Sequence, residues 1–353
     1  MTDTKRGRTS RISLVAGRRT SLSSAIAALA LAACGGGGGD TAPPPQATQP
    51  PASPSLVTSV PDPTYSVASP ERVAFETLNG FRGHCGFGLL RQDPRLDVSA
   101  KMYPTYVLRG AEVGDHSWFE TPHIMQPGKP GYTASTPEGR AALAGFPTNQ
   151  FTGESFAGIG SDASPAEKAR VNIGMLASTV YHGVHMFGPN TLVGIGQDEG
   201  MSTQYLAVHT GVGSDFRGQS PAGLVTFPCQ GSTGVRGRVE GEWPDPIAGL
   251  AASAGWTYPF GTPVFLMAPT DQTLVVSSYT IAPTAGGPPV EAALLNKATD
   301  PHQRLRSWEV FILPRYPLVN GASYSVQVSG TLDGKPFATA FQFTTDPHPF
   351  GRL

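Results

Sequence analysis

A run of five glycines at residues 35–39, followed by a proline-rich stretch that reaches residue 70, is the feature that most limits what this chain can fold into. Glycine-rich chain loses much conformational entropy on folding, and proline-rich chain favours an extended polyproline geometry. The 43 glycines and 34 prolines are concentrated here and at turn positions, so the remainder can still form cores. We therefore expect residues 34–69 to be a tether, with folded structure from about residue 70 onward.

A short leader precedes this tether. Basic residues open it, an apolar stretch too short to span a bilayer follows, and Leu31-Ala32-Ala33-Cys34 closes it. The ending resembles the lipobox of bacterial lipoproteins, which implies a signal peptide at residues 1–33 and acylation of Cys34. The resemblance predicts an exported protein held to the cell envelope by its lipid, in the outer membrane if the cell has one. A secretory leader cleaved before an incidental cysteine is the alternative.

Net charge limits the class of binding partner, and cysteine content indicates the redox state of the compartment. The formal net charge of −1, with no basic patch outside the leader, argues against a nucleic-acid partner. Of the three cysteines, lipidation of Cys34 leaves Cys85 and Cys229 as an even pair in an oxidising compartment. We predict a disulfide between them, with two buried, inert thiols as the alternative.

Residues 70–224 alternate helix signals with short strand signals. Capping residues stand before a proline at Ser69-Pro70, Asp93-Pro94 and Ser164-Pro165, which predicts three helix starts. Pro104 is expected to kink the second helix or end it early. Two β-like runs, at residues 191–195 and 205–210, follow the third helix. The pattern predicts an α+β fold in which helices cover a sheet.

The same region carries an ordered series of short motifs. They are Leu78-Asn79-Gly80-Phe81-Arg82, Gly86-Phe87-Gly88-Leu89-Leu90, Asp93-Pro94-Arg95-Leu96, Asp115-His116-Ser117, Gly153-Glu154-Ser155, Thr179-Val180-Tyr181-His182 and Gly194-Ile195-Gly196. The series resembles the bacterial CAP superfamily, also called the SCP or PR-1-like cysteine-rich secretory family, and implies its α-β-α sandwich. Ser155, Tyr181 and Gly183 depart from the family pattern, and the second acidic residue of its His/Glu tetrad has no clear counterpart.

The resemblance implies a cleft at His116, Glu154 and His182, to which His123, Ser155 and His185 are near enough in sequence to contribute. Two imidazoles and a carboxylate could form a hydrogen-bonded cluster, bind a divalent ion such as zinc, or act as acid and base. A long Gly/Pro-rich insertion, residues 118–150, could cover or reshape the cleft. His209 lies in an apolar run and is interpreted as a satisfied core histidine.

Residues 225–353 have a different pattern, in which Pro/Gly-rich turns separate short alternating strands. The pattern predicts a β-sandwich and resembles the Ig-like domains of bacterial surface proteins. Asp333-Gly334 is expected to form a hairpin turn, and the acidic, proline-rich segment 240–246 is interpreted as the linker between domains.

Together these features predict a lipid-anchored envelope protein whose CAP-like cleft binds a small lipid, a peptide, cell-wall material or a partner protein. The competing hypothesis is a metal-assisted or acid/base hydrolase that acts on peptides or cell-wall material. A third hypothesis makes both domains spacers, and it would be favoured if the 118–150 insertion filled the cleft.

Overall fold

The computed structural model describes residues 55–250 and 255–348. The predicted signal peptide at residues 1–33, the lipid attachment at Cys34 and the first part of the tether lie outside these residues. Within the described ranges, no helix is both long enough and apolar enough to cross a membrane.

The N-terminal part is built on one four-stranded sheet. Its strands are arranged in the order β1 (Arg91–Gln92), β3 (Leu192–Gly200), β4 (Thr203–Gly211) and β2 (Phe151–Gly160). The pairs β3–β4 and β4–β2 are antiparallel, and β1 joins β3 in parallel. Because side chains alternate across a strand, this sheet presents one apolar set to each face.

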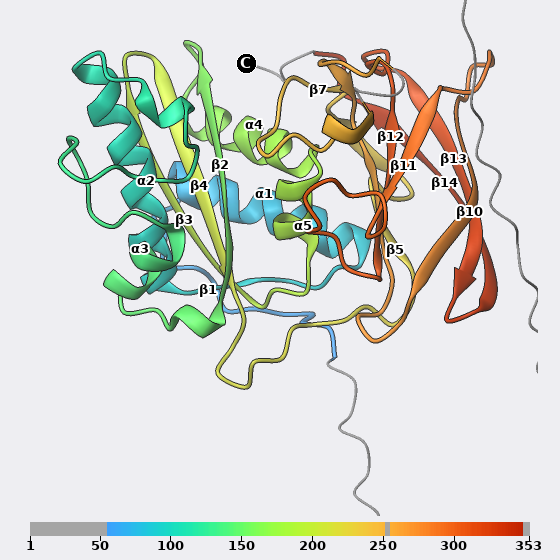
Figure 1. The fold of residues 1–353 in the computed structure, drawn as a ribbon, viewed down its shortest axis with the longest axis horizontal. Helices are drawn as coiled ribbons and strands as arrows, with labels where there is room; N and C mark the ends of the chain where they lie inside the picture. Colours follow the sequence, from blue (N-terminus) through green and yellow to red (C-terminus); the bar gives the residue numbers. More distant parts are fainter. Residues whose placement is uncertain (1–54, 251–254, 349–353) are drawn as a thin grey trace, which may run out of the picture. The chain divides into compact units, whose positions relative to one another are not determined.

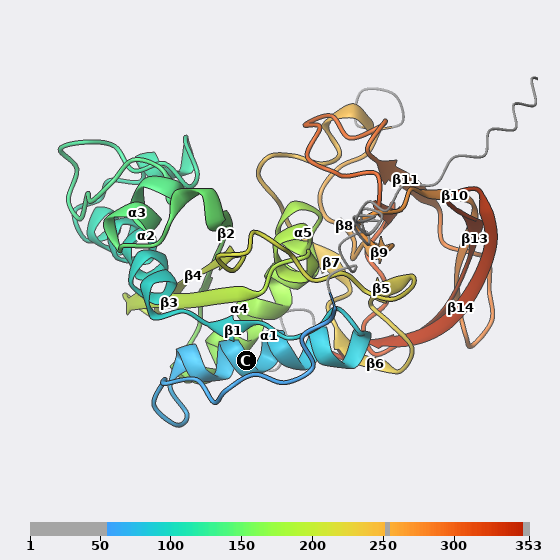
Figure 2. The same cartoon turned by 90° about the horizontal axis from the view of Figure 1, so that it is seen from below.

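Helices cover both faces of this sheet (Figures 1 and 2). Along one face run α2 (Pro94–Glu112) and α3 (Pro137–Leu143), and α1 (Pro70–Cys85) packs with α4 (Pro165–Ala177) on the other. The short elements that complete this part are η1 (Ser117–Phe119), η2 (Thr148–Gln150) and α5 (Tyr181–Phe187). The predicted α+β composition is confirmed.

The three predicted helix starts are confirmed by their caps. Ser69, Asp93 and Ser164 each accept a hydrogen bond from a backbone N–H of the first turn, and each is followed by proline. Of the two effects expected of Pro104, the early end of the helix does not occur. Helix α2 continues through this buried proline to Glu112, because packing against the sheet and the 118–150 insertion outweighs one lost backbone hydrogen bond.

The C-terminal part contains two four-stranded sheets and a two-stranded ribbon. The first sheet has the order β10 (Leu274–Pro283), β13 (Ser323–Leu332), β14 (Lys335–Thr345) and β6 (Ser232–Val235). The second has the order β11 (Ala292–Asn296), β12 (Glu309–Pro314), β9 (Val264–Met267) and β5 (Val225–Phe227). The ribbon pairs β7 (Arg238–Val239) with β8 (Phe260–Gly261).

The two larger sheets enclose a core of alternating inward side chains, among them Leu266, Ile312 and Phe343. The hairpin predicted at Asp333-Gly334 is present, and both residues have the positive φ that a two-residue β-turn of this kind requires. Figure 1 shows β10, β13 and β14 running side by side in this part.

An apolar cluster joins the two parts. Phe87 and Phe187 from the first part pack against Phe227, Phe265 and Phe311 from the second, with ring centroids as close as 4.2 Å. Residues 55–250 and 255–348 accordingly belong to one compact unit.

The predicted disulfide between Cys85 and Cys229 is confirmed, with an S–S distance of 2.12 Å. It ties the end of α1 to the segment between β5 and β6, which lies 144 residues further along the chain. Closing a loop of this length restricts the unfolded chain and so favours the folded one.

Candidate functional site

A cavity of about 330 Å³ lies where α5, β2 and the 118–150 insertion meet the C-terminal part. The insertion contributes His123, and α5 contributes His182 and His185. Trp243 and Arg304 come from the C-terminal part. The insertion therefore lines the cavity without filling it, so the arrangement that would favour the spacer hypothesis is not observed.

Glu154, on β2, is the buried carboxylate of this site and is 5% exposed. It accepts hydrogen bonds from His123 Nδ1 at 2.9 Å, from His209 Nε2 at 2.6 Å and from Arg140 Nη2 at 2.7 Å. Burial alone would raise the pKa of Glu154, but Arg140 and the two histidines hold that pKa well below its ordinary value. Glu154 is therefore a charged anchor and not a proton donor at neutral pH.

His209 holds Glu154 from the core side. Its ring is fully buried, and burial lowers its pKa, so the ring is neutral at pH 7. A neutral imidazole that donates Nε2–H to Glu154 must accept at Nδ1, where the Ser99 hydroxyl lies 2.7 Å away. The interpretation of His209 as a satisfied core histidine is confirmed.

His123 faces the cavity on the other side of Glu154. Because a carboxylate can only accept, His123 donates from Nδ1, and its Nε2 has no hydrogen-bond partner among the described residues. The side chain is 18% exposed, so this nitrogen can meet a ligand. Tyr103 supports the segment by accepting the backbone N–H of His123 at 2.7 Å.

His182 is oriented in the same way by Glu242, which comes from the segment expected to be a linker. Its Nδ1 lies 3.3 Å from Glu242 Oε1 and 3.0 Å from the Thr179 hydroxyl. Burial, with a contribution from the other histidines, lowers the pKa of His182 well below its ordinary value, so this ring is also neutral. Its Nε2 likewise has no hydrogen-bond partner in the part of the chain that the structure describes.

Glu242 also fixes the start of α5. Its carboxylate accepts the backbone N–H groups of Val180, Tyr181 and His182 at distances of 2.7 to 3.0 Å. Burial raises the pKa of Glu242 to about 7 despite these three bonds. The site therefore consists of two histidine–glutamate pairs, His123 with Glu154 and His182 with Glu242.

His185 and Ser155 lie beside these pairs. Burial lowers the pKa of His185 to about 4, so its ring is neutral above that pH. The Ser155 hydroxyl is 3.5 Å from His185 Nδ1, but Ser155 is fully buried and has no access to a substrate. The absence of a side chain at Gly153 leaves room for the His185 ring, because a Cβ at Gly153 would lie 2.5 Å from His185 Nε2.

The structure brings Glu154, His182, His123, Ser155 and His185 together as the sequence suggested, but it places His116 elsewhere. His116 is exposed next to η1 and is not among the described residues that line the cavity. His123 takes the position beside Glu154 instead, because the loop after η1 folds back over α2.

Sequence reasoning missed Arg140, Glu242 and Arg304. Arg140 lies in the long insertion, and the other two lie in the C-terminal part, so no local spacing connects them with the motifs. The one weak signal for Glu242 is its charge. An acidic side chain in the predicted linker could accept hydrogen bonds from the N–H groups at the start of a helix distant in sequence.

The cavity does not fit a zinc site with three protein ligands. In residues 55–250 and 255–348, the one group of three histidine, cysteine or acidic side chains with donor atoms all within 4.8 Å is His84, Cys85 and Cys229. In the cavity, Arg140 already neutralises Glu154, and a second cation beside that guanidinium would be repelled.

A second cavity, of about 420 Å³, adjoins the first and shares Thr152, Tyr181, His185 and Arg304 with it. The guanidinium of Arg304 lies 5.7 Å above the Tyr181 ring, and no carboxylate partner for it occurs in the described chain. Arg306 lines the same second cavity. The Arg304 guanidinium therefore brings a positive charge to the boundary between the two cavities, whereas Arg306 lies near Glu309 in the second cavity.

Comparison of the chain with protein-family models finds no match, and no curated protein matches it. The resemblance to the CAP superfamily accordingly stays a prediction from the motifs.

Proposed function

We propose that the two adjoining cavities bind a short peptide through its terminal carboxylate. The observation that carries the proposal is the position of Arg304. Its guanidinium is exposed, has no acidic partner among the described residues, and lies at the boundary of both cavities. Guanidinium groups bind carboxylates through two parallel hydrogen bonds, which gives both affinity and direction.

The two oriented histidines suit the rest of such a ligand. The Nε2 atoms of His123 and His182 are acceptors when the rings are neutral, and peptide N–H groups are donors. Trp243, which is 51% exposed at the cavity, offers an aromatic face to a ligand side chain. Charged and imidazole side chains, among them His123, His182 and Arg304, line the cavity and favour a polar ligand over a lipid tail.

We place this site in a lipid-anchored protein of the cell envelope, with a CAP-like domain followed by an Ig-like domain. The location is supported by the leader that ends at Cys34 and by the Gly/Pro-rich tether after it. The domain assignment is supported by the motif series and by a sheet between two helical layers. A binding protein on such a tether would meet peptides released from the cell wall.

The proposal is tested with two matched sets of tripeptides, one with free carboxyl ends and one with the same ends amidated. Thermal unfolding of the full chain is followed with each set in the presence of a chelator. We expect members of the acid set to raise the melting temperature and the amidated set to leave it unchanged. Equal shifts with both sets, or no shift with either, would contradict carboxylate recognition.

Hydrolysis of the same peptides is the second candidate, because His123 and His182 each lie beside a buried carboxylate. An imidazole held in this way can accept a proton from water, as a general base does. Mass spectrometry of the bound tripeptides after prolonged incubation separates the two functions. Intact peptides indicate binding alone, whereas products that disappear in His182→Gln indicate catalysis.

A further inference from the structure

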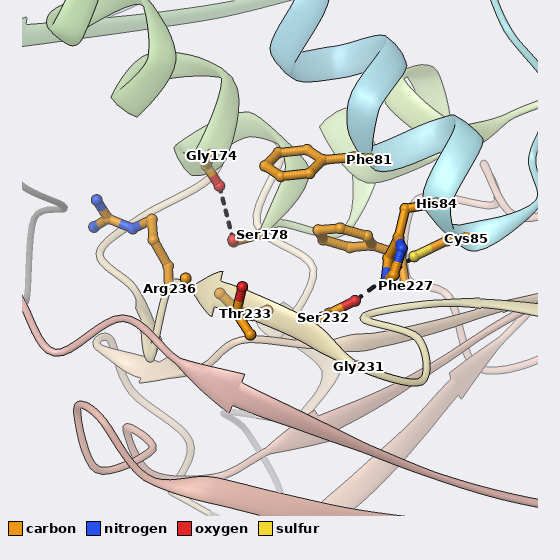
Figure 3. A pocket seen from close by; sticks show the side chains of 12 residues that line it. Phe81, His84, Cys85, Gly174, Ser178, Phe227, Gly231, Ser232, Thr233 and Arg236 are labelled. Carbon is orange, nitrogen blue, oxygen red and sulfur yellow. Dashed lines mark hydrogen bonds between the residues drawn. The ribbon is translucent and has the colours of Figure 1, made fainter.

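A separate pocket of about 250 Å³ lies between the ends of α1 and α4 and strand β6 (Figure 3). It shares no lining residue with the histidine–glutamate cavity. His84, Cys85 and Ser232 lie together on one side of it. The pocket therefore gives solvent and small ions access to the disulfide region.

The side chains around the disulfide are grouped closely enough to bind one ion. A ring nitrogen of His84 and the sulfurs of Cys85 and Cys229 all lie within 4.8 Å of one another. His84 is exposed, so its ring can turn toward the sulfurs without leaving the surface. The Ser232 hydroxyl lies 3.7 Å from Cys85 Sγ and 3.4 Å from Cys229 Sγ, which adds an oxygen at the same place.

The oxidised protein cannot use this group, because disulfide sulfurs carry no negative charge. Reduction changes the chemistry, since two thiolates and one imidazole are ligands that zinc prefers. In a tetrahedral zinc site with Zn–S distances of about 2.3 Å, two sulfurs are roughly 3.8 Å apart. The two sulfurs need to separate only to that distance, and their Cα atoms, 5.5 Å apart in the disulfide, need little movement.

We propose that His84, Cys85 and Cys229 form a zinc-type metal site that exists only when the disulfide is reduced. A dithiol reductant supplies two electrons and two protons and becomes a disulfide, and the S–S bond of the protein is replaced by two thiols. The metal ion then displaces the two thiol protons to solvent and binds both thiolates and the neutral His84 ring. Water or Ser232 completes the coordination.

A metal ion bound at this site would link the N-terminal and C-terminal parts of the molecule. Cys85 ends α1, and Cys229 lies between β5 and β6, so an ion bound to both would hold the same 144-residue loop closed that the disulfide closes. Metal binding to the folded state also stabilises it by mass action. The junction would thus stay tied under reducing conditions whenever zinc is present. This inference is independent of the proposed peptide site.

The test uses the full chain with Cys34→Ser, which leaves Cys85 and Cys229 as its only thiols. Cobalt(II) serves as the probe, because thiolate-to-cobalt charge transfer gives an absorption that histidine ligands alone do not give. Spectra are recorded with and without a phosphine reductant. The phosphine and one water molecule reduce the disulfide to two thiols, and the phosphine becomes its oxide. Zinc is then titrated in as the competitor.

We expect one cobalt per chain with the thiolate band after reduction, no such band before reduction, and loss of the band as zinc is added. His84→Ala should weaken cobalt affinity at least about tenfold, since even changes outside the ligand set cost that much. His116→Ala, which alters another exposed histidine, should leave affinity unchanged.

Two results would overturn the proposal. One is the absence of the thiolate band in reduced protein. This result counts against the proposal if the reduced protein is folded, and also if it is unfolded and cobalt does not refold it. The other is equal cobalt affinity in the reference protein and in His84→Ala. Metal-dependent refolding of a reduced chain that is unfolded without metal would support it.

Discussion

The carboxylate of Glu242 and the imidazole of His182 form a pair 3.3 Å apart, although the two residues lie 60 positions apart in the chain. The same carboxylate accepts three backbone N–H groups at the start of α5. One side chain thus orients a cavity histidine and also attaches the C-terminal part to the helix that presents it.

Replacing Glu242 is predicted to destabilise the fold. Glu242→Ala leaves three buried N–H groups without acceptors, and each such group costs about 1 to 3 kcal/mol unless water reaches it. We expect a loss of roughly 2 to 4 kcal/mol in the free energy of unfolding, measured by urea denaturation. Glu240→Ala, two residues away and in an exposed pair with Arg238, should change it by less than about 1 kcal/mol. Similar losses in both variants would contradict the capping role.

Arg140 is predicted to be required for a charged Glu154. Arg140→Met leaves a buried carboxylate without its cation, and breaking a buried pair in this way typically costs about 3 to 5 kcal/mol. The matched control is Arg95→Met, whose partly exposed pair with Asp93 should contribute less than about 1 kcal/mol. Chemical denaturation of the two variants decides the point, and a small loss in Arg140→Met would show that the pair is not the anchor of the site.

The helix starts and the hairpin turn could be predicted because each depends on a few adjacent residues. Caps followed by proline at Ser69, Asp93 and Ser164 depend on a few adjacent residues, and the Asp333-Gly334 turn depends on two. The Cys85–Cys229 pair was predicted because lipidation of Cys34 would leave these two cysteines as an even pair in an oxidising compartment. The early helix end considered for Pro104 does not occur, because burial against the sheet overrides helix propensity, and that burial cannot be predicted from a local pattern.

The site was only partly predictable for the same reason. Glu154 and His182 lie in recognisable motifs, whereas His123 and Arg140 reach Glu154 only through the path of the 118–150 insertion. Glu242 and Arg304 come from the C-terminal part, so their positions depend on how the two parts pack. His116 was chosen because Asp115-His116-Ser117 fits the motif series, and no local signal in the sequence shows that His123 lies beside Glu154 instead.

The close contact at Gly153 predicts a selective effect on the cavity. In Gly153→Ala, the new methyl group would meet the His185 ring at 2.5 Å and force it to turn. We expect a loss of about 1 to 3 kcal/mol in unfolding free energy, together with weaker peptide binding. Gly174→Ala, in α4 with no atom near the added Cβ, should instead gain about 0.5 to 1 kcal/mol from helix propensity. Denaturation curves that show the same change for both variants would be inconsistent with the contact.

The lowered pKa of His185 predicts part of the pH dependence of stability. Between about pH 4 and its ordinary value of 6.5, the unfolded chain holds a proton on His185 that the folded chain does not. Stability contributed by this group therefore rises with pH in that window, by up to about 1.4 kcal/mol per pH unit. His185→Asn should reduce the slope of unfolding free energy against pH by that amount. Val184→Ala, which changes no titrating group, should shift the free energy equally at each pH, and an unchanged slope in His185→Asn would refute the assignment.

The most direct measurement of the central claim is a double-mutant cycle by calorimetry between Arg304 and the carboxyl end of a tripeptide from the acid set. Affinities are compared for the reference protein and Arg304→Gln, each with the acid and the amidated peptide, and Arg217→Gln serves as a control at an exposed arginine that lines neither cavity. We predict a coupling energy of about 1.5 to 3 kcal/mol between Arg304 and the carboxylate, and none for Arg217. If the acid and amidated peptides lose equal affinity in Arg304→Gln, the cavities do not recognise a carboxylate through this residue.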